Sequence, residues 1–284
     1  MNAIEMKKVN KSFGDFAIRD FDFVLPEGCI CGLVGENGAG KSTSIRLLMG
    51  ALIADSGEIR VLGTDVNSPE FIGTKQDIGI VLDDAWFPDV LNVSQIRKIL
   101  KATYTNWNDS QFDAYMESFK LPYNKPIKDF SRGMRMKLAI AAALCHGAKL
   151  LVLDEATAGL DPIVRDEVLD LLNEFTRKED HSILISSHIT SDLEKICDYI
   201  AFIHEGKLYF CEEKDALCEK YGIFAGTKAE FAALEGDAVV YSEANSLGGV
   251  RAMVRRDRLP GETELEKCTI EDVILNIVKG ERRK

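Results

Sequence analysis

A glycine-rich loop between an apolar run and a helical run is the feature that most constrains this fold. The apolar run covers 29–34, and the helical spacing covers 43–49 and stops at Gly50. Between them the chain has the pattern G-x-x-x-x-G-K-S, whose residues are Gly35, Glu36, Asn37, Gly38, Ala39, Gly40, Lys41 and Ser42. A strand, a glycine loop and a helix in this order form a phosphate-binding loop. We therefore expect an α/β fold that binds a nucleotide.

The residue types of this loop suit a chain of phosphates. Glycines allow successive backbone N–H groups to turn toward one anion, and the helix that follows adds its positive dipole end. We expect Lys41 to reach the β- and γ-phosphates and the Ser42 hydroxyl to ligate Mg²⁺. The alternative is a chance glycine turn, which the flanking strand and helix disfavour.

A second apolar run, 150–153, ends in Asp154 and Glu155. A carboxylate at the end of a buried strand is costly unless it serves a metal ion or hydrogen bonds. We expect Asp154 to share Mg²⁺ with Ser42, and Glu155 to polarise the water that attacks the γ-phosphate. The alternative for Glu155 is a solvated acid in a strand-to-loop turn.

Two further elements gain meaning from their position relative to these motifs. Ser131 and Gly133 open a helical run, where a serine hydroxyl either caps the helix or faces an anion. Alone, this pair is a plain helix cap, but its place between the two motifs predicts a second phosphate-contacting surface. His188 follows the apolar run 182–185, at a strand end where ligands gather in open α/β sheets. It is a candidate γ-phosphate sensor, with an ordinary hydrogen-bonding role as the alternative.

The bulk composition excludes several classes of protein. A formal net charge of −11 argues against a general nucleic-acid binder, which needs a basic face. Seven cysteines without a CxxC pair favour a reduced cytosolic setting. No apolar run approaches the about 18–20 residues that span a bilayer, and the first residues do not resemble a signal peptide. Any membrane part is therefore expected on another chain.

The pattern of strands and helices divides the chain into three parts. Residues 1–85 and 146–210 are expected to form an α/β core, with a parallel sheet of nearly continuous apolar strands and an N-terminal antiparallel β part. Residues 86–145 are mostly helical, with helices capped by Asn92 and Asn108. Residues 211–284 form a small α+β extension with short strands near 238–241 and 250–255. Its last helix is capped by Thr269.

These motifs together resemble the ATPase subunits of ABC (ATP-binding cassette) transporters, over roughly residues 2–210. The loop and Thr43 look like Walker A, 150–155 like Walker B, and 158–161 like the D-loop. His188 falls on the family's switch histidine. The resemblance implies further nucleotide contacts at positions that the residue types alone do not reveal: Phe13, whose ring would stack against adenine, Thr43 and Asp161.

The chain departs from the family pattern at three places. The usual signature is L-S-G-G-Q, and here Arg132 and Met134 replace the first glycine and the glutamine. The glutamine of the Q-loop falls on Asp83, whose carboxylate would ligate Mg²⁺ directly or through water. Ala156 stands where proline is common. The segment 130–138 is similar to a bacterial group often associated with drug or antibiotic-peptide export.

The resemblance implies a P-loop ATPase that works in pairs. Two cassettes, as a homodimer or heterodimer, would enclose two ATP head to tail and drive a permease on a separate chain at the inner face of the membrane, contacted through 85–100. One alternative is a soluble ABC ATPase acting on nucleic acid or ribosomes, although the long coiled-coil insertion or second cassette of such proteins is not seen here. The other is a regulatory subunit that binds nucleotide without hydrolysis. Arg132, Met134 and Asp83 motivate it, whereas the intact Walker residues and His188 oppose it.

Overall fold

The computed structural model describes residues 1–83, 87–234, 236–244, 248–259 and 263–281. It divides into two compact units, Met1–Cys211 and Glu212–Lys284. The predicted boundary at 85 and 86, and the start of the segment predicted to contact a permease, lie outside the described residues. The two units are described in turn.

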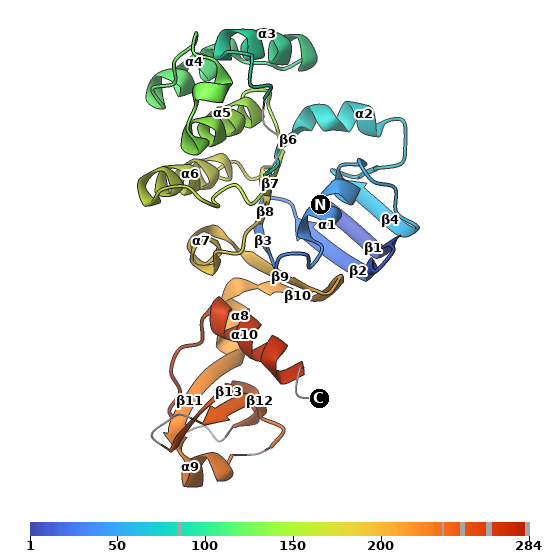
Figure 1. The fold of residues 1–284 in the computed structure, drawn as a ribbon. Coiled ribbons are helices and arrows are strands. Elements are labelled where there is room, and N and C mark those ends of the chain that lie inside the picture. Colours follow the sequence, from blue (N-terminus) through green and yellow to red (C-terminus); the bar gives the residue numbers. More distant parts are fainter. Residues whose placement is uncertain (84–86, 235, 245–247, 260–262, 282–284) are drawn as a thin grey trace. The chain divides into compact units, whose positions relative to one another are not determined.

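A six-stranded sheet in the order β10-β9-β3-β8-β7-β6 forms the centre of the first unit (Figure 1). Its strands are β3 (Ile30–Val34), β6 (Ile78–Val81), β7 (Leu150–Asp154), β8 (Ser182–Ser186), β9 (Tyr199–His204) and β10 (Lys207–Glu213). The pairs β3–β8, β3–β9, β6–β7 and β7–β8 are parallel. Every residue of β3, β7 and β8 is buried, which explains their continuous apolar sequences. Ser186 is aligned with Leu33 on one side and with Asp154 on the other, so three strand ends lie side by side.

A four-stranded antiparallel sheet in the order β2-β1-β4-β5 packs with this centre. Its strands are β1 (Asn2–Phe13), β2 (Phe16–Pro26), β4 (Ser56–Val61) and β5 (Thr64–Asp65). Buried residues alternate with exposed ones in β2, as expected for a sheet with one face on the core. Helix α1 (Lys41–Leu48) joins both sheets, because Ile45 and Leu47 belong to one apolar cluster with residues of each. The predicted fold class, a parallel sheet with an N-terminal antiparallel part, is confirmed.

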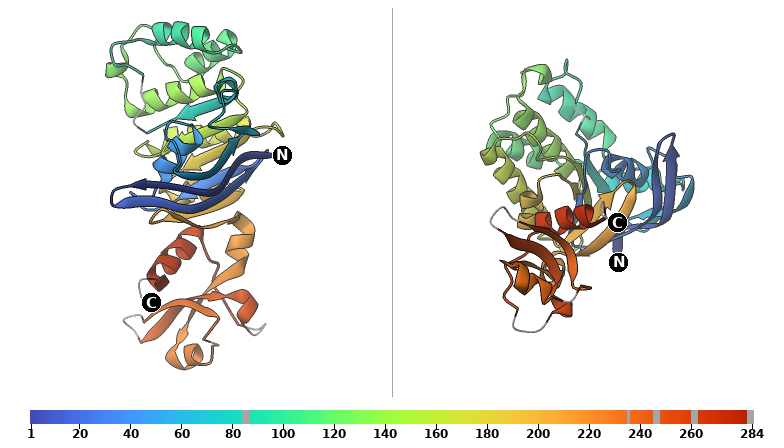
Figure 2. Two further views of the ribbon diagram at one scale, coloured as in Figure 1. Left: turned by 90° about the vertical axis from the view of Figure 1, so that its right-hand side faces the viewer. Right: turned by 60° about the horizontal axis from the view of Figure 1, so that its bottom comes forward.

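Helices α3 (Val93–Thr103) and α4 (Asp109–Ser118) lie apart from the strands, as the views in Figures 1 and 2 agree. Asn92 caps α3 by accepting a hydrogen bond from the Gln95 N–H, and Asn108 caps α4 in the same way, as predicted. Helix α4 ends at Ser118, and Lys120 just beyond it takes a left-handed conformation with φ of 53°. These helices share an apolar core with α5 (Arg132–Leu144). The other helices of the unit are α2 (Phe71–Thr74), α6 (Pro162–Phe175) and α7 (Thr190–Ile196).

Helix α5 also packs directly on β6 of the sheet. A Cβ atom at Gly79 of β6 would stand 2.7 Å from the Ala143 carbonyl oxygen, so only glycine permits this approach. The His146 ring lies just beyond, with its nitrogens 3.1 Å from the Ala142 oxygen and 3.2 Å from the Ile78 oxygen. Burial lowers the pKa of His146. The end of α5 is therefore held against the sheet, while Leu138, Ala141 and Cys145 also pack in the apolar core of the helical part.

The second unit is a three-stranded antiparallel sheet, in the order β11-β13-β12, with three helices. Its elements are α8 (Lys214–Lys220), β11 (Tyr221–Thr227), α9 (Lys228–Ala232), β12 (Val239–Ala244), β13 (Gly249–Arg255) and α10 (Ile270–Glu281). Thr269 and Asp272 exchange hydrogen bonds at the start of α10, as predicted. The sequence analysis predicts no element at α8, β11 or α9, and two glycines interrupt the alternation of β11. Within the described residues, no helix has the length and apolar character needed to cross a membrane.

Replacing Gly79 by alanine is expected to lower the free energy of unfolding by about 1–3 kcal/mol, because the new methyl group would overlap Ala143 and Leu151. Urea unfolding followed by circular dichroism measures this loss. Gly73→Ala is the matched control, since a Cβ there meets nothing within 4 Å. Equal midpoints for the two variants would contradict the close packing of α5 on β6.

Candidate active site

The predicted phosphate loop runs from the end of β3 to the start of α1. Gly38 and Gly40 have φ of 83° and 117°, in the left-handed region that favours glycine. A Cβ at Gly40 would stand 2.6 Å from the Ile18 side chain, so the loop is also held tightly from behind. Gly40 is the N-cap of α1 and makes no side-chain cap, so the first N–H groups of this helix remain available to an anion.

Lys41 is buried within the loop, with only 6% of its surface exposed. Its Nζ donates to the Gly35 carbonyl oxygen at 2.7 Å and to the Glu36 oxygen at 3.3 Å. The same nitrogen lies 3.4 Å from Glu155 Oε1. A buried cation is costly unless it is paired, and these oxygens offset that cost. The arrangement fixes one positive charge at the mouth of the loop.

Asp154 and Glu155 are both positioned by Ser186 at the end of β8. The Ser186 hydroxyl donates to Asp154 Oδ1 at 2.5 Å and accepts from the Glu155 backbone N–H at 3.0 Å. The Ser186 carbonyl accepts from the same N–H at 3.1 Å. Glu155 has φ of 52°, a left-handed conformation that costs a non-glycine residue about 1–2 kcal/mol. These bonds hold the strained residue in place, and such strain is typical of functional sites.

Lys41, Glu155 and His188 form one chain of contacts. His188 Nδ1 lies 2.7 Å from Glu155 Oε2, while Oε1 faces Lys41 and has no hydrogen bond although it is buried. A buried acceptor without a hydrogen bond usually has a functional explanation. The three predicted catalytic residues are thus brought together around the carboxylate of Glu155.

The predicted Mg²⁺ ligands can be tested by their chemistry. Ser42 lies in the first turn of α1, and Asp154 ends β7 with 5% of its surface exposed and one oxygen bound by Ser186. A hydroxyl and a carboxylate are hard oxygen donors of the kind that Mg²⁺ prefers, so these two residues fit the ion. Asp83, the third predicted ligand, instead accepts a hydrogen bond from Arg132 at 2.9 Å.

Ser131 and Asp161 each cap a helix. Ser131 Oγ accepts from the Met134 N–H at 3.2 Å at the start of α5, and Asp161 Oδ1 accepts from the Val164 N–H at 3.1 Å at the start of α6. The two helix starts are neighbours, because a Cβ at Gly133 would stand 3.3 Å from Val164. Ser131 is exposed, so the start of α5 faces outward with its helix dipole.

Comparison with known proteins identifies the family of this chain. A family model for the ABC transporter matches residues 18–158. An uncharacterised ABC transporter ATP-binding protein of Bacillus subtilis (strain 168), YhcH, is 32% identical over 212 residues, 72% of this chain and 68% of that protein. The lantibiotic transport ATP-binding protein SrtF of Streptococcus pyogenes is 33% identical over 215 residues, 75% of this chain and 91% of that protein. The chain belongs to the ATP-binding subunits of ABC transporters.

The predicted family and the predicted ATP-hydrolysing activity are therefore confirmed for this ABC subunit. A solved structure of the ATP binding subunit of an ABC transporter has a TM-score of 0.69 at 23% identity. The two structures align over 76% of this chain and 91% of that chain, and this likeness supports the assigned fold class.

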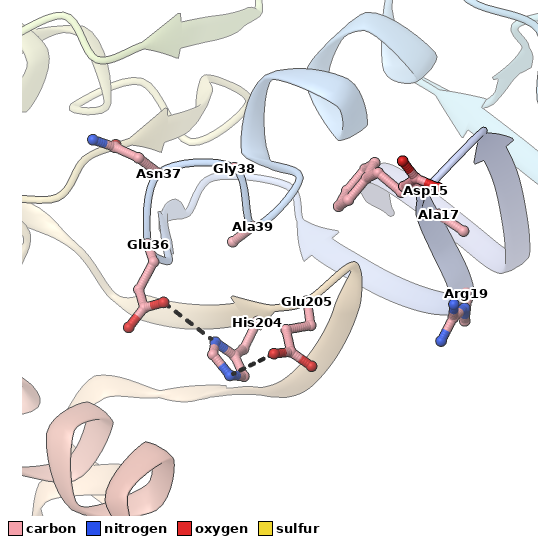
Figure 3. Close-up of a pocket in the computed structure, with 10 residues that line it drawn as sticks. Asp15, Ala17, Arg19, Glu36, Asn37, Gly38, Ala39, His204 and Glu205 are labelled. Carbon is pink, nitrogen blue, oxygen red and sulfur yellow. Dashed lines mark ion pairs between the residues drawn. The ribbon is translucent and has the colours of Figure 1, made fainter. Parts of the chain in front are cut away.

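A cavity of about 340 Å³ lies beside the phosphate loop of this chain (Figure 3). Glu36 of the loop lies 4.0 Å from the buried His204, whose other ring nitrogen is 3.9 Å from Glu205. Phe16 also lines this cavity and packs over Gly40, with Cζ 3.1 Å from the position of a Cβ. Phe13, the predicted adenine contact, pairs with Phe16 across the hairpin and is 41% exposed, outside the lining of the cavity.

Sequence reasoning missed three residues of this site. Ser186 could have been found from its place directly after an apolar run that parallels the strand of Asp154. Phe16 follows Phe13 by three residues, and either ring could have served the same role on sequence grounds. His204 ends a strand-like run without a motif around it, so its position behind the loop had no sequence signal.

Ser186→Ala is expected to lower the free energy of unfolding by about 2 kcal/mol, because a hydrogen bond to a charged group is lost inside the protein. Urea unfolding without nucleotide measures this loss. Ser187→Ala is the matched control: this serine is equally buried, but its hydroxyl accepts from a neutral N–H, that of Ile189, so the expected loss is about 1 kcal/mol. A larger loss for Ser187 than for Ser186 would contradict the assigned contacts.

Proposed function

We propose that two cassettes, at least one of them this chain, enclose two ATP molecules head to tail and drive a permease on a separate chain. The observation that carries the proposal is the convergence of Lys41, Glu155 and His188 at the phosphate loop, which gives one chain a complete hydrolytic half-site. Ser131 and Gly133 of the same chain open an outward-facing helix. They suit the nucleotide of a partner cassette.

Each residue of the half-site has a role that follows from its position. Lys41 and the N–H groups at the start of α1 bind the β- and γ-phosphates. Ser42 and Asp154 would hold Mg²⁺, which when bound neutralises phosphate charge. Phe13, Thr43 and Asp161 complete the contacts to the nucleotide, as the family resemblance implies. Their assignment rests on position in the sequence rather than on contacts in the fold.

Glu155 is proposed as the residue that polarises the attacking water. Oε2 contacts His188 and Oε1 faces the Lys41 cation, so the carboxylate lies between the phosphate-binding lysine and the histidine, where it can accept a proton from water. The strained backbone of Glu155, held by Ser186, limits how far this carboxylate can move. His188, 55% exposed, lies at the open side of the pair and is placed to contact the γ-phosphate.

The segment that follows residue 87 is proposed to contact the permease. Val90 is 81% exposed, so its apolar side chain is available to a partner chain. Through this contact the subunit would act at the inner face of the membrane. The lantibiotic transport role in the name of the streptococcal relative supports export of an antibiotic-type peptide as the transported class.

Glu155→Gln is expected to bind ATP but to reduce hydrolysis by about 100-fold or more, because the amide cannot accept the proton from water. The variant should then accumulate as a dimer with MgATP, which light scattering detects. Glu117→Gln, an identical exchange at an exposed acid on α4, is the control and should hydrolyse ATP normally. A Glu155→Gln protein that stays monomeric under saturating MgATP over a wide range of concentration would contradict the shared site.

Val90→Asp is expected to abolish co-purification with the permease, since a charge replaces an apolar contact. The candidate permease is the product of a neighbouring gene with about six apolar segments, each long enough to span a bilayer. Ile53→Asp changes another exposed apolar residue, at 74% exposure, and should leave co-purification intact. Co-purification of ribosomes or nucleic acid in place of a membrane protein would favour the soluble ABC ATPase alternative.

A further inference from the structure

Two departures from the family pattern meet in the fold. Arg132, in the signature segment, donates to Asp83 Oδ1 at 2.9 Å, although 49 residues separate them in the chain. Asp83 lies two residues beyond the end of β6, and Arg132 is the first residue of α5. The ion pair therefore joins the loop after the edge strand of the sheet to the start of the signature helix.

This ion pair lies at the opposite end of the α5–β6 contact from the close approach at Gly79. Ala143, near the end of α5, meets Gly79 near the start of β6, so the helix and the strand run antiparallel. At the Gly79 end, α5 and β6 are in close steric contact. At the other end, the two elements are joined by the Asp83–Arg132 pair, which can open without overlap of atoms.

The D-loop is part of the same contact. A Cβ at Gly159 would stand 3.4 Å from both Cζ and Nε of Arg132, so the Arg132 side chain lies beside this glycine. Gly159 has φ of 67°, a conformation that favours glycine.

The charges of the pair depend on one another. Arg132 places a cation in the first turn of a helix, where the dipole disfavours positive charge. Asp83 supplies the compensating anion at that end. If Asp83 turned toward a metal ion, Arg132 would remain uncompensated at the helix start, which opposes such a movement.

We propose that Asp83 pairs with Arg132 and does not ligate Mg²⁺. In this arrangement Arg132 is a positioning residue that holds the start of α5 to the loop after β6 and to the D-loop. Movement of α5 on ATP binding is then transmitted to the segment that begins at residue 87. This inference rests on the proposed function, because the movement is driven by the nucleotide of a partner cassette.

A charge-reversal cycle on the full chain tests the inference by its hydrolysis rate. Asp83→Asn and Arg132→Gln are each expected to slow MgATP hydrolysis by roughly two- to five-fold, the range of an exposed ion pair. The Mg²⁺ concentration for half-maximal rate should stay unchanged. The reversed pair Asp83→Arg/Arg132→Asp should recover part of the lost rate, because it restores the ion pair but not the contact of Arg132 with Gly159. High salt should shrink the defect of the single variants relative to wild type, because salt screens the pair.

Hydrogen exchange of the nucleotide-free chain gives a second readout that does not depend on ATP hydrolysis. Amides of residues 78–83 should exchange faster in both single variants and return toward wild type in the reversed pair. Because no nucleotide is needed, this result stands even if the chain forms no ATP-bound dimer. The control is Glu212→Gln, which breaks an ion pair of similar exposure between Glu212 and Lys220, 2.8 Å apart in the second unit. This variant should change neither the hydrolysis rate nor the exchange of residues 78–83.

Three results would overturn the inference. A raised Mg²⁺ requirement for Asp83→Asn, without recovery in the reversed pair, would make Asp83 a metal ligand. A defect confined to Arg132 variants would place that side chain on the partner's nucleotide. Single variants equal to wild type in both rate and exchange would show that the pair does not hold the start of α5 to the loop after β6.

Discussion

The rest of the site depends on one buried hydroxyl, that of Ser186. It lies between the ends of β3 and β7, and it contacts the side chain of Asp154 and the backbone of Glu155 together. Parallel strands bring their carboxyl ends to one edge of the sheet, so this edge collects polar groups whose burial must be offset. The Ser186 hydroxyl offsets the burial of two such groups, the Asp154 carboxylate and the Glu155 backbone N–H. As a result, the residue predicted to hold a metal and the residue predicted to act on water keep a fixed spacing.

The site concentrates charge and strain where the surrounding fold is most rigid. Lys41 is buried against carbonyl oxygens of its own loop, and Glu155 keeps an unfavourable backbone conformation beside it. Both are stable only because β3, β7 and β8 are wholly buried and cannot shift. His188 is different, since it is mostly exposed and contacts the site through one bond to Glu155. The rigid groups suit binding and water activation, and the exposed ring suits a group that responds to the nucleotide.

Local patterns in the sequence predicted the elements that depend on local physics. The phosphate loop, the asparagine caps of α3 and α4 and the serine cap of α5 each require only a few neighbouring residues, and each lies where predicted. Contacts between distant segments could not be predicted in this way. Ser186 acquires its role from a strand 32 residues away, and Asp83 meets Arg132 only because α5 folds back along β6. The second unit was the least predictable, because its glycine-interrupted strand β11 lacks a clear period.

Helix α5 connects these observations, because it contacts both the other helices and the sheet. Leu138 and Ala141 belong to the apolar core that α5 shares with α3 and α4, while Ala143 lies against Gly79 of the sheet. The start of α5 carries the exposed Ser131 and the Asp83–Arg132 pair, and its end is held by the close approach at Gly79. The proposed movement of α5 at Ser131 therefore reaches the loop after β6 through that pair.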